Sequence, residues 1–231
     1  MGAKGGFNMK TKLLIQGLAK YIIGVIIVML LVFLPAGTLR FPNGWLFMAS
    51  LFVPMLIFGI VLYVKAPSLL EKRLNTKEQE KEQKGVVALS GLMFLGGFVV
   101  AGLTYRFGWI SFPKWAAVIG VVMFLLSYAM YAEVMRENAY LSRTVEVQEE
   151  QKVIDTGLYG VVRHPMYSAT VLMFLSIPVI LGSVAAFVIF LIYPILMAMR
   201  IGNEEKVLEQ GLKGYTEYKQ KVKYRLIPFI W

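Results

Sequence analysis

The chain has 231 residues, of which 58% are apolar and 16% are charged. Several apolar runs reach the length of about 20 residues that crosses a bilayer as a helix. This composition predicts an all-α integral membrane protein. The chain has no cysteine and a single histidine, which excludes disulfides, thiol nucleophiles and a multi-histidine metal centre within one chain. We expect no metal.

The net charge of +10 does not indicate a nucleic-acid partner. The basic residues cluster beside the apolar runs, where they set topology and contact anionic lipid headgroups. We therefore expect a membrane partner and no nucleic acid. The sequence also lacks a phosphate-binding P-loop and paired catalytic histidines, which argues against an ATPase or a zinc protease.

About six membrane helices are predicted in chain order. The first four cover approximately Leu18–Pro35, Gly44–Val64, Val86–Tyr105 and Trp115–Tyr131. The apolar block Met166–Met199 is too long for one span and carries Pro178 and Gly182-Ser183 near its middle. These turn-forming residues predict a helical hairpin. A solvated helix over Ile201–Lys221 is expected to continue from its second arm.

The basic residues define the expected orientation. If the spans alternate in direction, only Arg40, Arg106 and Lys114 fall on the side opposite to all other lysines and arginines. Cytoplasmic loops of membrane proteins carry such an excess of basic residues. We therefore expect both termini and the segment around His164 to lie in the cytoplasm.

The most unusual polar cluster is Arg163-His164-Pro165, at the beginning of the hairpin. Residues 145–154 favour an extended or irregular run, which ends at a turn containing Gly157. Pro165 suits the first turn of a helix, so Arg163 and His164 would lie at a helix N-terminus that can bind a carboxylate or phosphate. The alternative is that Arg163 is a snorkelling interfacial arginine and His164 a helix-cap residue, with Tyr159 and Tyr167 in an aromatic belt.

A second polar cluster follows the hairpin. Arg200 and Glu204 are four residues apart on one helical face, and Glu205 is adjacent. Because a hairpin brings its ends together, this cluster is expected to meet the His164 cluster. The basic, aromatic tail either lies on lipid headgroups or covers the site and contributes Tyr218, Lys221 or Arg225.

These elements in order resemble a known family. Gly157-x-Tyr159, Arg163-His164-Pro165-x-Tyr167, an apolar hairpin, Glu204-Glu205 and Tyr215-x-x-Tyr218 before Pro228 resemble the isoprenylcysteine carboxyl methyltransferase family, which is related to membrane phospholipid methyltransferases. The resemblance covers approximately residues 120–231. It divides the chain into N-terminal membrane helices, 1–119, and a methyltransferase-like membrane and cytoplasmic catalytic region, 120–231.

The resemblance implies S-adenosylmethionine as the cofactor. The residues that it places at or near the cofactor are Gln148, Gln151, Val153, Ile154, Gly157, Leu158, Tyr159, His164, Tyr167, Glu204 and Glu205. It assigns catalytic roles to Arg163, Arg200, Glu204 and Arg225, with Lys221 as an alternative to Arg225. The implied acceptor is lipid-like or lipidated.

The implied reaction is methylation of a carboxylate. A carboxylate acceptor is already ionised at neutral pH, whereas an amine acceptor needs a base, for which Glu204, Glu205 or His164 are candidates. Phospholipid or other amine N-methylation is therefore the alternative reaction. A transporter or scaffold is the alternative class, although the first four spans are nearly free of the charged residues that an ion pathway needs.

Overall fold

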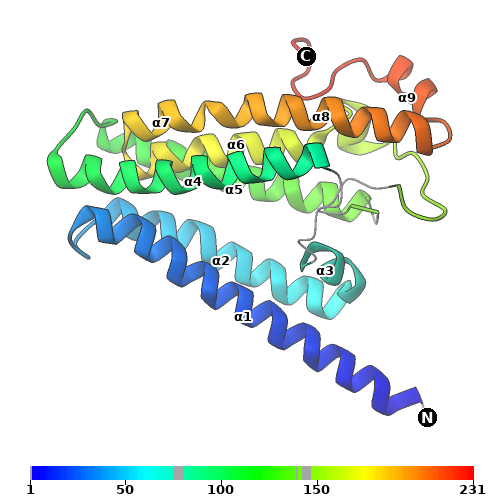
Figure 1. The fold of residues 1–231 in the computed structure, drawn as a ribbon, viewed down its shortest axis with the longest axis horizontal. Coiled ribbons are helices and arrows are strands. Elements are labelled where there is room, and N and C mark those ends of the chain that lie inside the picture. The colour runs from blue at the N-terminus through cyan, green and yellow to red at the C-terminus, as the bar shows by residue number, and fades with distance from the viewer. Residues whose placement is uncertain (1, 75–80, 139, 142–146) are drawn as a thin grey trace.

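The computed structural model describes residues 2–74, 81–138, 140–141 and 147–231. Apart from one isolated bridge between Ser111 and Ser183, these residues form helices, turns and irregular segments (Figure 1). The prediction of an all-α fold is confirmed. Five helical stretches in the described residues are long and apolar enough to cross a membrane.

The first two long helices form an antiparallel pair. They are α1 (Gly2–Ala36) and α2 (Pro42–Lys65), joined by a short turn (Figure 1). Pro42 occupies the first turn of α2, where its missing N–H leaves no intrahelical hydrogen bond unmade. A short helix, α3 (Pro67–Leu74), follows and packs against both.

The middle of the bundle is built by α4 (Lys81–Phe107) and α5 (Lys114–Glu137). α4 packs against α1, α6, α7 and α8, while α5 lies along α6. Three fully buried rings, those of Phe47, Phe124 and Phe190, belong to this core. The core therefore ties the N-terminal helices to the hairpin.

The predicted hairpin is present. Its first arm is α6 (Pro165–Leu181), and its second arm is α7 (Val184–Phe190) followed by α8 (Ile192–Gly211). Gly182 ends α6 with φ 81°, a left-handed conformation that favours glycine. The Ser183 hydroxyl then accepts a hydrogen bond of 3.0 Å from the Ala186 amide and caps α7.

The number and extent of the last helices differ from the prediction. Besides the five candidate spans, α6 is a shorter apolar helix of 17 residues. The expected single helix over 201–221 is wrong: α8 ends at Gly211, and α9 (Tyr215–Lys221) begins after a break. Gly214 precedes α9 with φ 88°, which a continuous right-handed helix does not allow.

The long helices run back and forth between two ends of the bundle. The turns α1–α2, α4–α5 and α6–α7 gather at one end of the bundle, and the N-terminus, α3 and α9 lie toward the other (Figure 1). The end of the bundle that carries α3 and α9 also carries both polar clusters. Its placement in the cytoplasm stays a prediction.

Candidate active site

The segment before α6 is irregular, as predicted. Residues 147–156 form neither helix nor strand; the expected run began at residue 145, and its first two residues lie outside the described part of the chain. A short 3-10 helix, η1 (Gly157–Gly160), leads to His164, which is the N-cap of α6. The backbone amides of Arg163 and His164 donate to the carbonyls of Tyr224 and Arg225, both at 2.9 Å. The tail therefore lies over this segment.

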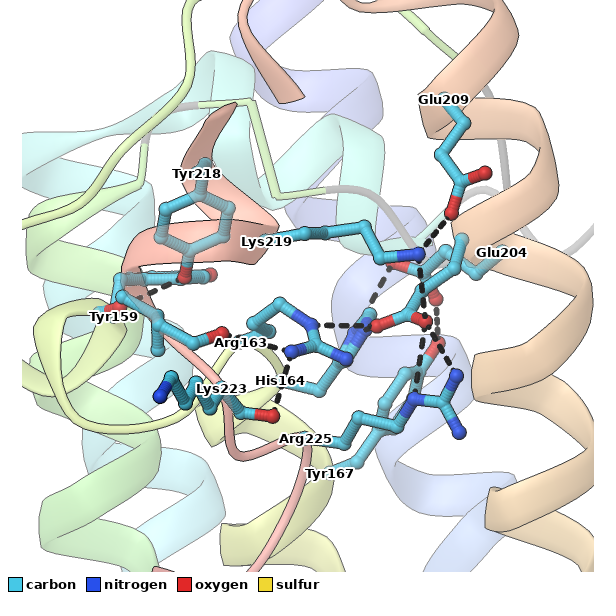
Figure 2. A network of polar contacts seen from close by, with 12 residues as sticks. Tyr159, Arg163, His164, Tyr167, Glu204, Glu209, Tyr218, Lys219, Lys223 and Arg225 are labelled. Atoms are coloured by element: carbon cyan, nitrogen blue, oxygen red, sulfur yellow. Dashed lines mark hydrogen bonds and ion pairs between the residues drawn. The ribbon is translucent and has the colours of Figure 1, made fainter. Parts of the chain in front are cut away.

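A buried ion pair joins the two ends of the hairpin. The Arg163 Nε donates to Glu205 Oε1 at 2.7 Å (Figure 2). The same guanidinium donates through Nη1 to the carbonyls of Val222 and Lys223, at 2.7 and 2.8 Å. Glu205 is only 2% exposed. Arg163 therefore links α6, α8 and the tail.

Further basic side chains surround the same carboxylate. The His164 Nε2 lies 3.2 Å from Glu205 Oε1. Arg225 reaches Glu205 Oε2 through Nε and Nη2, at 3.1 and 3.0 Å, and Lys219 Nζ lies 3.9 Å from the same oxygen. A buried carboxylate needs such partners to remain charged. Glu205 is therefore fully engaged in holding the helices and the tail together.

Glu204 faces a different set of partners. Its Oε2 accepts a hydrogen bond of 2.5 Å from the Tyr167 hydroxyl, which itself accepts from Arg200 Nε at 2.8 Å. The His164 Nδ1 lies 3.9 Å from Glu204 Oε1, and the His164 ring is stacked on Tyr167. The Glu204 side chain is 22% exposed. Of the two adjacent glutamates, Glu204 is the one that remains accessible to a ligand.

A pocket opens beside Glu204 between the segment before η1, the start of α6, α8 and α9. It is lined by nine of the residues that the sequence predicted: Gln151, Val153, Ile154, Tyr159, Arg163, His164, Tyr167, Arg200 and Glu204. These residues come from distant parts of the chain. The fold therefore brings together the two clusters that the hairpin was expected to join.

Five predicted site residues lie outside this lining: Gln148, Gly157, Leu158, Glu205 and Arg225. Glu205 and Arg225 form the ion-pair network described above, behind the pocket. Gln148 Nε2 donates to the Tyr140 carbonyl at 2.5 Å, and its Oε1 accepts from Lys72 Nζ at 2.6 Å. Gln148 thus fastens α3 to the wall of the pocket. Its assigned contact with a cofactor stays a prediction.

Gly157 and Leu158 contact a helix end. The Leu158 amide donates to Glu137 Oε2 at 3.3 Å. Gly157 has φ 52°, and a Cβ at this position would lie 1.6 Å from Glu137 Oε1. The need for glycine here arises from this left-handed backbone conformation, because the nearby Glu137 carboxylate is the end of a flexible side chain and can move.

Ten further residues line the pocket, and the sequence did not predict them as cofactor contacts. They are Asn138, Tyr140, Leu141, Lys152, Pro165, Met166, Leu208, Leu212, Tyr215 and Tyr218. Leu208 and Leu212 follow Glu204 at intervals of four residues, so they share its helical face. That spacing was available in the sequence and would have identified them.

Tyr159, Tyr215 and Tyr218 of the pocket wall are protonated at neutral pH. Burial raises the pKa of Tyr159 to about 12, and burial also raises the pKa values of Tyr215 and Tyr218. The Tyr218 hydroxyl donates to the Tyr159 carbonyl at 2.7 Å. The Tyr215 hydroxyl is buried without a hydrogen-bond partner among the described residues. Most buried polar atoms have a hydrogen-bond partner, so this hydroxyl is a candidate contact for a ligand.

These residues fit S-adenosylmethionine. The donor combines a cationic sulfonium and ammonium with a carboxylate and an adenine ring. The Glu204 carboxylate and the Tyr167 ring suit the cationic groups. The apolar side chains of Val153 and Leu212 suit a ring. The unpartnered Tyr215 hydroxyl supplies one more polar contact.

Residues 115–213 match the family model described as phospholipid methyltransferase. The matched segment begins at α5 and ends before α9, so it contains both arms of the hairpin and most of the pocket lining. The match confirms the resemblance to this group of membrane methyltransferases over those residues. It supports the class of membrane methyltransferase for the protein.

One solved structure with a similar chain is that of the eukaryotic intramembrane Ras methyltransferase, isoprenylcysteine carboxyl methyltransferase. The two chains share 18% sequence identity over 92% of this chain and 84% of the other, with a TM-score of 0.48. Likeness of this degree does not define an activity. No curated protein sequence matches the chain.

Proposed function

We propose that this protein is an S-adenosylmethionine-dependent methyltransferase of the membrane that methylates a carboxylate on a lipid-like or lipidated acceptor. The supporting observation is the chain of contacts Arg200–Tyr167–Glu204, which closes the two ends of the hairpin around one pocket. The match to a methyltransferase family covers the same elements.

The donor would be held by the residues at the accessible side of the pocket. Glu204 and Tyr167 would face its cationic groups, and Tyr215 would donate to it from α9. When bound, S-adenosylmethionine would supply a methyl group on a positively charged sulfur. The bond from this carbon to the acceptor oxygen would form as the carbon–sulfur bond breaks, and the donor would leave as a neutral thioether. A carboxylate acceptor has no proton to lose in this reaction.

The protein's own contribution is alignment and exclusion of water. Displacement at an activated methyl group needs correct orientation and a dry site. Buried Arg200 gives the pocket a positive wall that attracts an acceptor carboxylate. Tyr215 and Tyr218 of α9 cover the pocket from the other side. No general base is required for this acceptor.

Amine methylation of a phospholipid is the second candidate, because the matching family is described as phospholipid methyltransferase. An ammonium acceptor must lose a proton before it attacks. Glu204 is the partly exposed carboxylate of the site and would accept that proton. Methylation of a fatty acid but not of phosphatidylethanolamine by the purified protein would favour the first reaction, and the reverse would favour the second.

The decisive experiment is calorimetric titration of S-adenosylhomocysteine into the purified protein in detergent. We expect saturable binding by the wild type, and loss of binding in Glu204→Gln and His164→Ala. Glu209→Gln is the matched control, since Glu209 lies on the same helix and pairs with Lys219 outside the pocket. Absence of binding by a folded wild type would overturn the proposal.

We further propose that both termini and the site face the cytoplasm. The chain has no cysteine, so single-cysteine variants report sidedness directly. Lys213→Cys near the site and Ile110→Cys in the α4–α5 connection, where Ile110 is 81% exposed, lie at opposite ends of the bundle. In intact cells, a membrane-impermeant maleimide should label only Ile110→Cys.

A further inference from the structure

A second cavity lies between α1 and α2, where α3 covers them. Its volume is about 340 Å³, within the range of about 300–1,000 Å³ that is typical of small-molecule sites. We call it the α1–α2 cleft. It is lined by Leu13, Leu14, Gly17, Leu18, Lys20, Tyr21, Met55, Leu56, Gly59, Ile60, Tyr63, Leu70, Arg73 and Leu74.

The charge of the cleft is one-sided. Among the residues that the structure describes, the charged members of its lining are Lys20 and Arg73, and both are cations. Lys20 Nζ donates to the carbonyl of Leu74 at the end of α3. The remaining lining residues are apolar side chains, tyrosines and glycines. An apolar cavity with two cations at its α3 end is complementary to an amphiphile with a hydrocarbon chain and an anionic head.

Arg73 connects this cleft with the donor pocket. Its guanidinium lies over the Tyr131 ring, 5.3 Å from the centroid, and its Nη1 reaches Met166 Sδ at 4.0 Å. Met166 lines the donor pocket. A single side chain therefore borders the apolar cleft and touches the wall of the pocket in which Glu204 lies. An anionic head bound by Arg73 would therefore lie at the boundary between the two cavities.

We propose that the α1–α2 cleft binds the hydrocarbon chain of the methyl acceptor and that Arg73 pairs with its anionic group, an inference that rests on the function proposed above. The acceptor class is a long-chain amphiphile with a single negative charge. Arg73 is the specificity residue, because it selects charge at the boundary between the two cavities. Residues of α1, α2 and α3, outside the segment that matches the family, thus select the substrate.

The test uses the protein in phosphatidylcholine nanodiscs with two photoreactive probes. One probe is a long-chain fatty acid that carries a diazirine near its terminal methyl group, and the other is the corresponding alcohol. Gly59→Phe fills the cleft, since a Cβ at Gly59 meets no atom within 4 Å. Gly91→Phe is the matched control, because Gly91 is equally open but lies on α4 outside the cleft.

We expect the fatty acid to label α1 and α2 of the wild type and of Gly91→Phe. In Gly59→Phe, this labelling should be lower by about fivefold or more, which corresponds to about 1 kcal/mol in binding. Arg73→Gln should remove the preference for the acid over the alcohol, and Arg73→Lys should retain it. Equal labelling in the two phenylalanine variants, or an undiminished preference in Arg73→Gln, would overturn the proposal.

Two further measurements separate this proposal from the proposed function. S-adenosylhomocysteine binding should be unchanged in all four variants, because none of the altered residues lines the donor pocket. In the methylation reaction, Gly59→Phe should raise KM for the fatty acid with little change in kcat. A wild type that labels correctly but binds no S-adenosylhomocysteine would refute the reaction, whereas failure of labelling refutes only the cleft.

Discussion

Arg163 and Glu205 are 42 residues apart in sequence, and their side chains meet at 2.7 Å in the interior of the protein. The arginine precedes α6 and the glutamate lies near the end of α8, so this contact closes the hairpin. Arg163 also binds two carbonyls of the tail. The adjacent residues, His164 and Glu204, face the pocket. One buried pair thus positions the groups that are available to a ligand.

Breaking this pair is expected to destabilise the protein strongly. Arg163→Ala leaves a buried carboxylate with one partner fewer, and removal of one member of a buried pair typically costs about 3–5 kcal/mol. We expect a large fall in Tm, measured by thermal unfolding in detergent. Lys221→Ala removes an exposed pair with Asp155 and should change Tm little. Equal effects of the two substitutions would contradict the structural role of Arg163.

The Tyr215 hydroxyl is expected to serve a ligand more than the fold. It is buried but has no partner within the described residues, so Tyr215→Phe should leave Tm unchanged or raise it. If the hydroxyl donates to the bound donor, S-adenosylhomocysteine affinity should fall by about threefold to tenfold, the value of one neutral hydrogen bond. Calorimetric titration measures this change.

Tyr218→Phe provides the matched comparison for Tyr215. It removes a hydrogen bond to the Tyr159 carbonyl and should lower stability by about 0.5–1.5 kcal/mol. Unchanged affinity in Tyr215→Phe would show that its hydroxyl does not contact the donor.

Gly157→Ala should destabilise the segment that leads to the site. The left-handed conformation costs a residue other than glycine about 1–2 kcal/mol, and the new methyl group would also meet the Glu137 carboxylate. Tm should fall, and Glu137→Ala in the same chain should recover the steric part of the loss. A double-mutant cycle on Tm measures this coupling. Strictly additive effects would contradict the close approach.

Alkaline pH should reveal the burial of Tyr159. Its pKa rises from 10.0 to about 12 because burial disfavours the phenolate, so the folded state retains a proton that the unfolded chain has lost. This contribution is complete below pH 10 and makes stability fall as the pH rises from about 10 to 12. The wild type should lose about 2 to 3 kcal/mol relative to Tyr159→Phe over that range. Chemical denaturation at several pH values measures the difference.

The hairpin was predictable because its signals are local. Gly182 and Ser183 interrupt a long apolar block, and residues of this kind favour a turn wherever they occur. Once a hairpin is assumed, the meeting of Tyr167 with Glu204 follows from geometry. The break before α9 was missed, although Gly211 and Gly214 are residues that commonly end a helix and therefore indicate it in the sequence.

The sequence by itself determined the membrane character, the helical class and the two polar clusters, since these depend on composition and on the spacing of neighbouring residues. The different environments of Glu204 and Glu205 were decided by tertiary structure. The two side chains are chemically identical and adjacent, yet Glu205 is enclosed by Arg163, His164 and Arg225 while Glu204 borders the pocket. Burial and the choice of partner depend on α8 packing against α6 and the tail, and no local pattern encodes such contacts.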